Sequence, residues 1–276
     1  MNIRTDLVTE EKLCFNGTEG FCSEEKTVGG IQIEITEIKS DGLSKQIGKP
    51  KGKYCTLRFE RLDGITDTAP LKNALVSSLS ELAGGRCDNA LVAGLGNADI
   101  TPDALGPLCV NSVIATRHIP ESLKKSLGLS DLRRVSCIAP NVLGKTGIEA
   151  ADMIKAAVSA VRPEIVIAVD ALAANTPENL CRTVQMTDSG IAPGSGVKNE
   201  RAALCADTLG VPVIAVGIPT VIDANCLSSG IKTGESMMVT PKEIDLLVSR
   251  AAAVTARAIN MFLQPSLDEA TIESLS

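Results

Sequence analysis

From residue 90 onward, the apolar residues of this chain gather in short uninterrupted runs with amphipathic stretches between them. The runs are rich in Val, Ile and Ala, a pattern typical of strands buried on both faces of a parallel sheet. They predict strands at 90–95, 134–139, 164–169, 183–186 and 211–217. The remaining stretches predict helices at 121–127, 147–161, 199–208 and 241–262, and a short one after Asp103.

The first ninety residues follow a different pattern. Residues 31–38 alternate apolar and polar side chains, which predicts a half-buried strand, and 54–59 is its expected partner. A helix is expected over 70–82, because four leucines recur on one face and Gly84 follows. The first 25 or so residues are polar and irregular, which indicates an arm or a processed segment.

Strands alternating with helices predict the fold class. We expect an α/β fold: a Rossmann-like, phosphorylase-type, mostly parallel sheet with helices on both faces and a small N-terminal β extension. One domain is expected over 1–276, with the extension at 28–60 and the core at 90–262. Thr146 and Glu149 have the spacing of a capping box, which predicts that they start the helix that follows.

Composition narrows the functional classes. Aromatic residues make up only 2% of the chain, so the core is expected to be aliphatic. The net charge of −6 is spread without a strong block, which argues against a nucleic-acid surface. Nine scattered cysteines without a CxxC pair favour reduced thiols in a cytosol-like compartment. No apolar run is expected to approach the roughly 20 residues that span a bilayer, so we expect a soluble intracellular protein.

Two aspartates stand where apolar runs end. Asp103 closes ALVAGLGNADITPDALGP (90–107), and Asp170 closes EIVIAVDALA (164–173). We expect each just past the carboxyl end of its strand, the edge at which open α/β sheets bind ligands. Two carboxylates that meet there can share one proton and act as an acid–base pair. Helix capping is the alternative interpretation of Asp103.

Two turns resemble nucleotide-binding loops without matching them. GLGNAD (94–99) has Asp99 in place of the third glycine of a dinucleotide fingerprint, so a tight strand-to-helix turn is the favoured interpretation. APNVLGKT (139–146) begins with alanine, and its proline lacks the N–H that a phosphate loop would use. Lys145 is the best feature for nucleotide binding, and a solvated lysine is the alternative.

The remaining side-chain chemistry is limited. His118 is the single histidine, so a Ser–His or Cys–His catalyst would have to use it, and a metal centre with two or three histidines is excluded. PGSG (193–196) is not a nucleophile elbow, because Pro193 replaces the first glycine. A carboxylate site for magnesium or calcium stays open, with these ligands: Asp99, Asp103, Asp170 and Asp188.

Several longer segments resemble the germination protease family of endospore-forming bacteria. They occur in the family's order and cover most of the chain from residue 90 onward. The segments are RTDL (4–7), GLGN and TPDALGP (94–107), TRH (116–118), TGIE (146–149), IAVDALA (167–173), DSGIAPGSGV (188–197), TLGVPVIAVGIPTVIDA (208–224) and MVTPKEID (238–245).

This resemblance implies an aspartate-dependent endopeptidase without a cofactor or bound metal. It places the family's two proposed catalytic aspartates at Asp103 and Asp170. It also implies degradation of small acid-soluble spore proteins in the forespore or spore core, a homotetramer, and no membrane or direct nucleic-acid partner. Zymogen processing would cut the Asp6–Leu7 bond and leave 1–6 as the pro-segment. The fold is expected to resemble that of hydrogenase maturation proteases, whose metal-binding acids suggest a metal-assisted alternative.

Further residues are candidates for binding the substrate or stabilising an oxyanion, because glycine lets main chain approach a ligand. They are Gly94, Gly96, Asn97, Asp188, Gly194, Ser195 and Gly196. The chain departs from the family at Lys198, at Asn175 and in the short segment 226–237, so a compact variant with altered access is expected. A non-catalytic binding protein for spore proteins or nucleotides is the second alternative.

Overall fold

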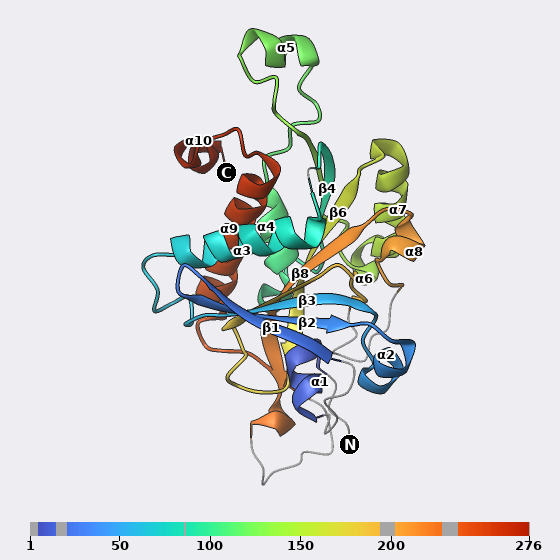
Figure 1. Ribbon diagram of the computed structural model, residues 1–276, viewed down its shortest axis with the longest axis vertical. Helices are drawn as coiled ribbons and strands as arrows, with labels where there is room; N and C mark the ends of the chain where they lie inside the picture. The colour runs from blue at the N-terminus through green and yellow to red at the C-terminus, as the bar shows by residue number, and fades with distance from the viewer. Residues whose placement is uncertain (1–4, 15–20, 86, 194–201, 228–236, 276) are drawn as a thin grey trace.

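The computed structural model describes residues 5–14, 21–85, 87–193, 202–227 and 237–275 (Figure 1). The strands are β1 (Phe21–Val28), β2 (Ile31–Ile38), β3 (Gly52–Arg58), β4 (Asn89–Gly94), β5 (Arg134–Ile138), β6 (Ile165–Ala174), β7 (Thr183–Thr187), β8 (Val213–Asp223) and β9 (Met238–Val239). The α-helices are α1 (Val8–Cys14), α2 (Asp41–Ile47), α3 (Ala69–Ala83), α4 (Leu105–Asn111), α5 (Glu121–Ser126), α6 (Leu143–Thr146), α7 (Ala150–Val161), α8 (Ala206–Leu209), α9 (Ile244–Leu263) and α10 (Glu269–Leu275).

All these strands belong to one sheet in the order β1-β2-β3-β7-β8-β6-β4-β5, with β9 beside β8. The four strands β8, β6, β4 and β5 are parallel to their neighbours in that order. The strands β1, β2, β3, β7 and β8 pair antiparallel, so the N-terminal extension continues the same sheet instead of forming a separate one. The expected α/β class is confirmed, with the parallel strands at one end of the sheet and the antiparallel strands at the other.

Helices cover both faces of the parallel strands. In β4, Ala90 and Val92 pack with α3, α4 and α9, whereas Leu91 and Ala93 pack with α7 and α8. Alternate residues of a strand point to opposite faces, so a continuous apolar run fills two cores at once. This explains why the strand runs show no alternation. In Figure 1, α3 and α9 cross beside the sheet, and α5 stands apart from the rest at one end.

The longest helix, α9, corrects the expectation that no apolar run approaches the length of a membrane span. Its 20 residues are long and apolar enough to cross a bilayer by length and composition. However, 67% of its most apolar window is buried inside the protein. Leu247, Val248 and Ile259 lie in the core that α9 shares with α3 and α4, which is the environment of a core helix.

The N-terminal region is more regular than expected. The prediction of an irregular first 25 residues is wrong for the described part, because Val8–Cys14 forms α1 and β1 already begins at Phe21. Leu7 and Val8 are completely buried. The sequence pattern is misleading here because most of the segment is polar, whereas its few apolar residues are buried in apolar clusters.

The predicted capping box at Thr146 and Glu149 is also wrong. Thr146 ends the short helix α6, and Gly147 closes that helix in the left-handed conformation with a φ of 70°. The next helix therefore begins at Ala150, with Glu149 at its N-cap position and no capping bond from its side chain. The Thr146 hydroxyl instead bonds to the main chain of Ile148.

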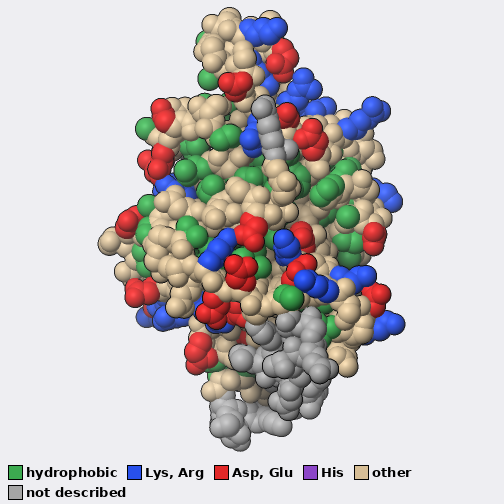
Figure 2. Space-filling view, viewed as in Figure 1, with side chains coloured by type: hydrophobic (Ala, Val, Ile, Leu, Met, Phe, Trp, Pro, Cys, Tyr) green, Lys and Arg blue, Asp and Glu red, His purple; other side chains and the backbone are tan. Residues whose placement is uncertain are grey.

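Two strands run beyond their predicted ends. The strand predicted to end at 169 continues as β6 to Ala174, and the strand predicted to end at 217 continues as β8 to Asp223. Because the two strands pair along this extension, polar residues that we expected in loops lie within the sheet. Of the helix expected over 199–208, the structure describes residues 202–208. The prediction is wrong for 202–205, and the helix there is α8, Ala206–Leu209. Acidic and basic side chains are interspersed over the face shown in Figure 2, as the even charge pattern indicated.

Candidate active site

A cavity of about 1570 Å³ opens where β4 ends and β6 continues alone on that side. Its lining comes from the N-terminal segment, the turn after β4, and the outer ends of β6, β7 and β8. The polar and charged residues on which its chemistry depends are Thr5, Asp6, Lys49, Asp103, Asp170, Gln185, Thr187, Asp188 and Ser189.

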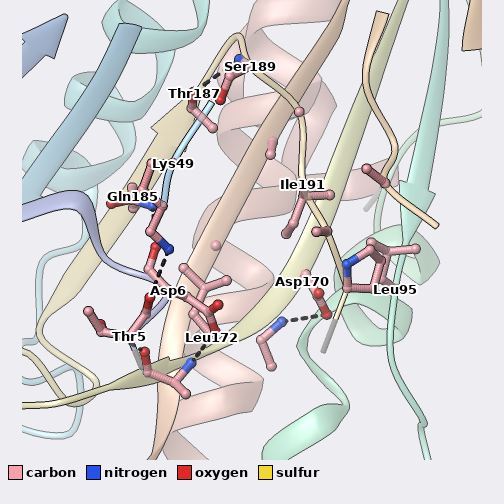
Figure 3. Close-up of a pocket in the computed structure, with 18 of the residues that line it drawn as sticks. Thr5, Asp6, Lys49, Leu95, Asp170, Leu172, Gln185, Thr187, Ser189 and Ile191 are labelled. Atoms are coloured by element: carbon pink, nitrogen blue, oxygen red, sulfur yellow. Dashed lines mark hydrogen bonds between the residues drawn. The ribbon is translucent and has the colours of Figure 1, made fainter. Parts of the chain in front are cut away.

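Asp170 lies inside strand β6, which corrects the prediction that it follows the strand end. It is 6% exposed and pairs in register with Gly217 of β8. Its Oδ1 accepts a hydrogen bond from the Ala171 N–H at 2.9 Å (Figure 3). On the other side of β6, the last residue paired with β4 is Val169. Asp170 is thus the first residue of β6 beyond the end of its neighbour, which opens its surroundings to the cavity.

Asp103 ends a short 3-10 turn, Thr101–Asp103, that follows β4. Its Oδ2 accepts a hydrogen bond from the Asn97 N–H at 2.9 Å, and its carbonyl oxygen accepts from the same N–H at 3.1 Å. The alternative interpretation of Asp103 as a helix cap is wrong, because Ala104 is the N-cap residue of α4 and no side chain caps that helix. The carboxylate is therefore positioned by the turn and not by the helix that follows.

The turn after β4 brings the two acids to one cavity. The Leu95 N–H donates to the Val169 carbonyl at 2.8 Å, directly before Asp170. Gly96, with a φ of 108°, lies so close to Asp103 that a Cβ there would be 2.1 Å from its carbonyl oxygen and 3.0 Å from Oδ1. The predicted pair, Asp103 and Asp170, thus lines a common cavity. Two carboxylates in one partly buried site are the arrangement from which acid–base catalysis is built.

Some of the candidate substrate-binding residues line the cavity, and others hold neighbouring parts of the chain together. Gly96 lines the cavity, whereas Gly94 does not and instead lets α4 approach β4: a Cβ there would be 2.2 Å from the Gly106 carbonyl. Asn97 is buried, and its Oδ1 accepts from the Asp99 N–H, so it shapes the turn. Asp188 lines the cavity, but its Oδ1 accepts from the Lys53 N–H and so joins β7 to β3. Gly194, Ser195, Gly196 and Lys198 lie outside the described residues.

The residues that the alternative mechanisms would use either lie outside the cavity or form ion pairs with other residues. His118 is exposed and does not line the cavity. Lys145, the lysine of the near-miss phosphate loop, forms an ion pair with Asp99. Within the described ranges, no group of three or more His, Cys, Asp or Glu side chains is placed to hold a metal ion.

A feature that the sequence did not indicate is the chain's own N-terminal segment in this cavity. The Asp6 N–H donates to the Ala173 carbonyl at 3.1 Å, and the Asp6 Oδ2 accepts from the Ala173 N–H at 2.9 Å. The Leu7 side chain is fully buried beside Leu172, Ala174 and Ile191. Figure 3 shows Thr5 and Asp6 beside Leu172 and Gln185, in the same cavity as Asp170. The cavity therefore already holds a stretch of polypeptide.

Glu10 fastens this segment to the turn after β6. Its carboxylate is 3% exposed and accepts hydrogen bonds from the main-chain N–H groups of Asn175 (2.7 Å) and Thr176 (3.0 Å). It also accepts from the Thr176 hydroxyl at 2.9 Å and from the Asn179 side-chain amide at 2.7 Å. A buried carboxylate with this many donors is well satisfied. Asn175, one of the positions at which the chain departs from the family, thus binds Glu10 through its main-chain N–H.

Lys49 faces the same segment from the turn after α2. Its Nζ donates to the Thr5 carbonyl at 2.8 Å. Burial lowers the pKa of the Lys49 ammonium, while the carboxylates of Asp6, Glu11 and Glu10 oppose that shift. A lysine placed in this way can hold a main-chain carbonyl while its charge is balanced by neighbouring acids.

Three hydroxyl groups form a chain along the cavity wall. The Ser189 hydroxyl lies 2.8 Å from that of Thr187 and donates to the Tyr54 oxygen at 2.9 Å, and the Tyr54 hydroxyl donates to the Pro50 carbonyl at 2.7 Å. Burial raises the pKa of Tyr54 to about 12, although the hydrogen bond from Ser189 opposes the shift. The wall is therefore neutral and polar at physiological pH.

Tyr54 offers a direct test of this packing, because it is the single tyrosine and the chain has no tryptophan. Phenolate absorbance should rise with a midpoint near pH 12 in the folded protein and near the ordinary value of about 10 in urea. A raised folded-state pKa means that this contribution to stability is complete below pH 10 and is lost as pH rises toward 12. A folded-state midpoint near 10 would mean that the hydroxyl is open to water.

Comparisons with known proteins agree on one family. The family described as "Germination protease" matches residues 3–233. A germination protease of Caldanaerobacter subterraneus subsp. tengcongensis is 37% identical over 321 residues, covering 100% of this chain and 98% of that protein. One of Clostridium perfringens is 35% identical and covers 96% of each chain. One of Bacillus subtilis is 40% identical over 82% of this chain and 65% of that protein. Among solved structures, a NiFe hydrogenase maturation protease from Thermococcus kodakarensis matches with a TM-score of 0.38 and 16% identity, over 66% of this chain and 98% of that one.

Proposed function

Because the chain belongs to the germination protease family, we propose that it is an endopeptidase that degrades small acid-soluble spore proteins during spore germination, with Asp103 and Asp170 as its acid–base pair. The observation that carries the proposal is the cavity that both acids line, which also holds the chain's own main chain at Asp6. A site that accommodates polypeptide main chain in the same cavity as two carboxylates has the parts that peptide hydrolysis needs.

In this mechanism, the carboxyl groups of Asp103 and Asp170 share one proton, so that one is ionised and the other is protonated. The ionised carboxylate deprotonates a water molecule, which attacks the carbonyl carbon of the substrate. The protonated carboxyl donates its proton to the carbonyl oxygen as the water attacks. The other carboxyl then passes the proton that it took from water to the leaving amine nitrogen as the C–N bond breaks, and a hydroxyl of the tetrahedral intermediate returns its proton to the first carboxylate. The Gly96 N–H is the candidate for stabilising the developing charge on the carbonyl oxygen, because Gly96 lines the cavity and the N–H groups of Leu95 and Asn97 already donate to Val169 and Asp103.

Self-processing at Asp6–Leu7 is part of the proposal, and the resting structure constrains it. Asp6 is bonded to Ala173, which lies three residues beyond Asp170 along β6. At about 3.3 Å per strand residue, this places the bond roughly 10 Å from the Asp170 position. Processing therefore requires the segment to slide along β6 or to reach the acids of a second chain. A homotetramer in the spore core, as in the family expectation, would supply such neighbours.

The proposal is tested by incubating the purified chain with a small acid-soluble spore protein, with and without EDTA, and reading the products by mass spectrometry. Discrete internal cuts that are insensitive to EDTA are the expected result. Cuts that disappear with EDTA would move the same acids into a metal-assisted mechanism. A spore protein that stays intact, even after removal of residues 1–6, would contradict the endopeptidase proposal.

A further inference from the structure

Strand β6 has an open edge next to Asp170. Its pairing with β4 ends at the Gly94–Val169 pair, yet β6 continues to Ala174. Residues two apart on a strand direct their main-chain groups to the same side. Val169 bonds to Leu95 on this side, and Ala173 bonds to Asp6 on this side. Ala171, midway between them, therefore directs its main chain to the same edge, where its N–H donates to the Asp170 Oδ1 at 2.9 Å, and it lines the cavity.

Gln185 of β7 faces the segment that occupies this edge. Its side-chain Nε2 donates to the Asp6 carbonyl at 2.9 Å, and its Oε1 accepts from the Val8 N–H at 2.5 Å. The primary amide thus contacts the main chain on both sides of Leu7, as a neighbouring strand would. These contacts do not depend on the side chains of the bound peptide. Gln185 is 7% exposed, so the amide is held in place by its surroundings.

We infer that the edge of β6 at Ala171–Ala173, together with the Gln185 amide, is the binding site for the main chain of the substrate, which adds to the sheet as an extended strand. This inference rests on the proposed endopeptidase function. The segment Thr5–Val8 occupies the site in a resting register, with Asp6 opposite Ala173. A substrate in the productive register would pair with Ala171 instead, which brings its peptide bond next to Asp170. Strand addition of this kind takes affinity from main-chain bonds.

The two registers differ by two residues, which is one repeat of strand pairing. A shift of that size along β6 would place Asp6 opposite Ala171, whose N–H would exchange its bond to Asp170 for one to the incoming chain. It would also move the Asp6–Leu7 bond from Ala173 toward the acids. The same edge would therefore serve the resting segment, its processing and the substrate. Occupation by one polypeptide would exclude the other.

This exclusion can be measured without catalysis. Full-length Asp103→Asn protein is mixed with a purified small acid-soluble spore protein, and hydrogen–deuterium exchange is followed in peptides that cover residues 5–10. We expect exchange there to rise severalfold as the spore protein displaces the segment. Cleavage by the wild type is measured in parallel. Unchanged exchange with cleavage by the wild type would overturn the binding mode and leave the endopeptidase. Faster exchange without cleavage would overturn the endopeptidase and keep the binding site. Unchanged exchange without cleavage would overturn both.

Gln185→Leu tests the two main-chain contacts of the Gln185 amide directly. Gln32→Leu, at an exposed position of β2, is the matched control. Loss of two main-chain hydrogen bonds should accelerate exchange of residues 5–10 by about tenfold and raise KM for the spore protein by a similar factor, with kcat little changed. Wild-type exchange and KM in Gln185→Leu, or equal effects in both variants, would overturn the assignment. The spore-protein experiment retains Gln185 and therefore decides the question even if Gln185→Leu folds poorly.

Discussion

Asp170→Asn and Asp103→Asn are each expected to lower kcat/KM for cleavage of a spore protein by about 10³-fold, within the range that positioned proton transfer contributes. Asparagine has nearly the same shape as aspartate but neither takes up nor donates a proton at these steps. The Asn97 N–H would still find an oxygen acceptor at position 103, and so would the Ala171 N–H at position 170. The loss should therefore appear in activity and not in folding, as measured by initial rates and thermal unfolding.

Asp207→Asn is the matched control. Asp207 is an exposed aspartate in α8 at the rim of the same cavity, so the substitution removes one carboxylate from the surroundings without touching the pair. Its activity should stay within about twofold of the wild type, because exposed charges are screened by water and salt. Retention of cleavage by Asp103→Asn or Asp170→Asn would rule out the acid–base pair. A similar loss in all three variants would point to a general effect of cavity charge.

Gly106→Ala is expected to have the largest effect on stability, about 3 kcal/mol or more. A Cβ on Gly106 would lie 2.2 Å from the Leu95 carbonyl oxygen, 2.4 Å from the Leu95 nitrogen and 2.5 Å from the Val169 carbonyl oxygen. All three are backbone atoms at the point where α4 crosses β4 and β6, so no side chain can move aside. Relief requires α4 to shift, and α4 begins two residues after Asp103. Denaturant unfolding and cleavage assays on the same protein would measure both consequences.

Gly144→Ala provides the control for helical glycine. Gly144 lies in α6, and its added Cβ would meet no atom within 4 Å. Alanine should be neutral or stabilising there by roughly 0.5–1 kcal/mol, because it restricts the unfolded chain and favours helix. If Gly106→Ala were as stable as Gly144→Ala, the close approach of α4 to the two strands would be incorrect.

The sequence alone determined the fold class, because buried strands and amphipathic helices have different periods. It also indicated Asp103 and Asp170, since an acid at the end of a buried apolar run needs a reason to be there. The family resemblance, carried by long segments such as IAVDALA and TPDALGP, is confirmed by the comparisons. The sequence predicted the ends of strands and helices less accurately. Residues such as Asp170 and Asp223 are polar, yet pairing with a neighbouring strand keeps them in the sheet.

Only the tertiary structure decided which distant residues share the cavity. Gln185 lies between two apolar residues in a strand that also contains two threonines, and Glu10 is one acid in a polar segment, so neither stands out along the chain. Their importance comes from partners more than 160 positions away: Gln185 binds the main chain at Asp6, and Glu10 binds the turn at Asn179. Periodicity reports which face of an element is buried, whereas such contacts depend on how the elements are placed. The sequence therefore determined the α/β class and indicated two acids, and the tertiary structure decided the strand order and the packing of the N-terminal segment in the cavity that those acids line.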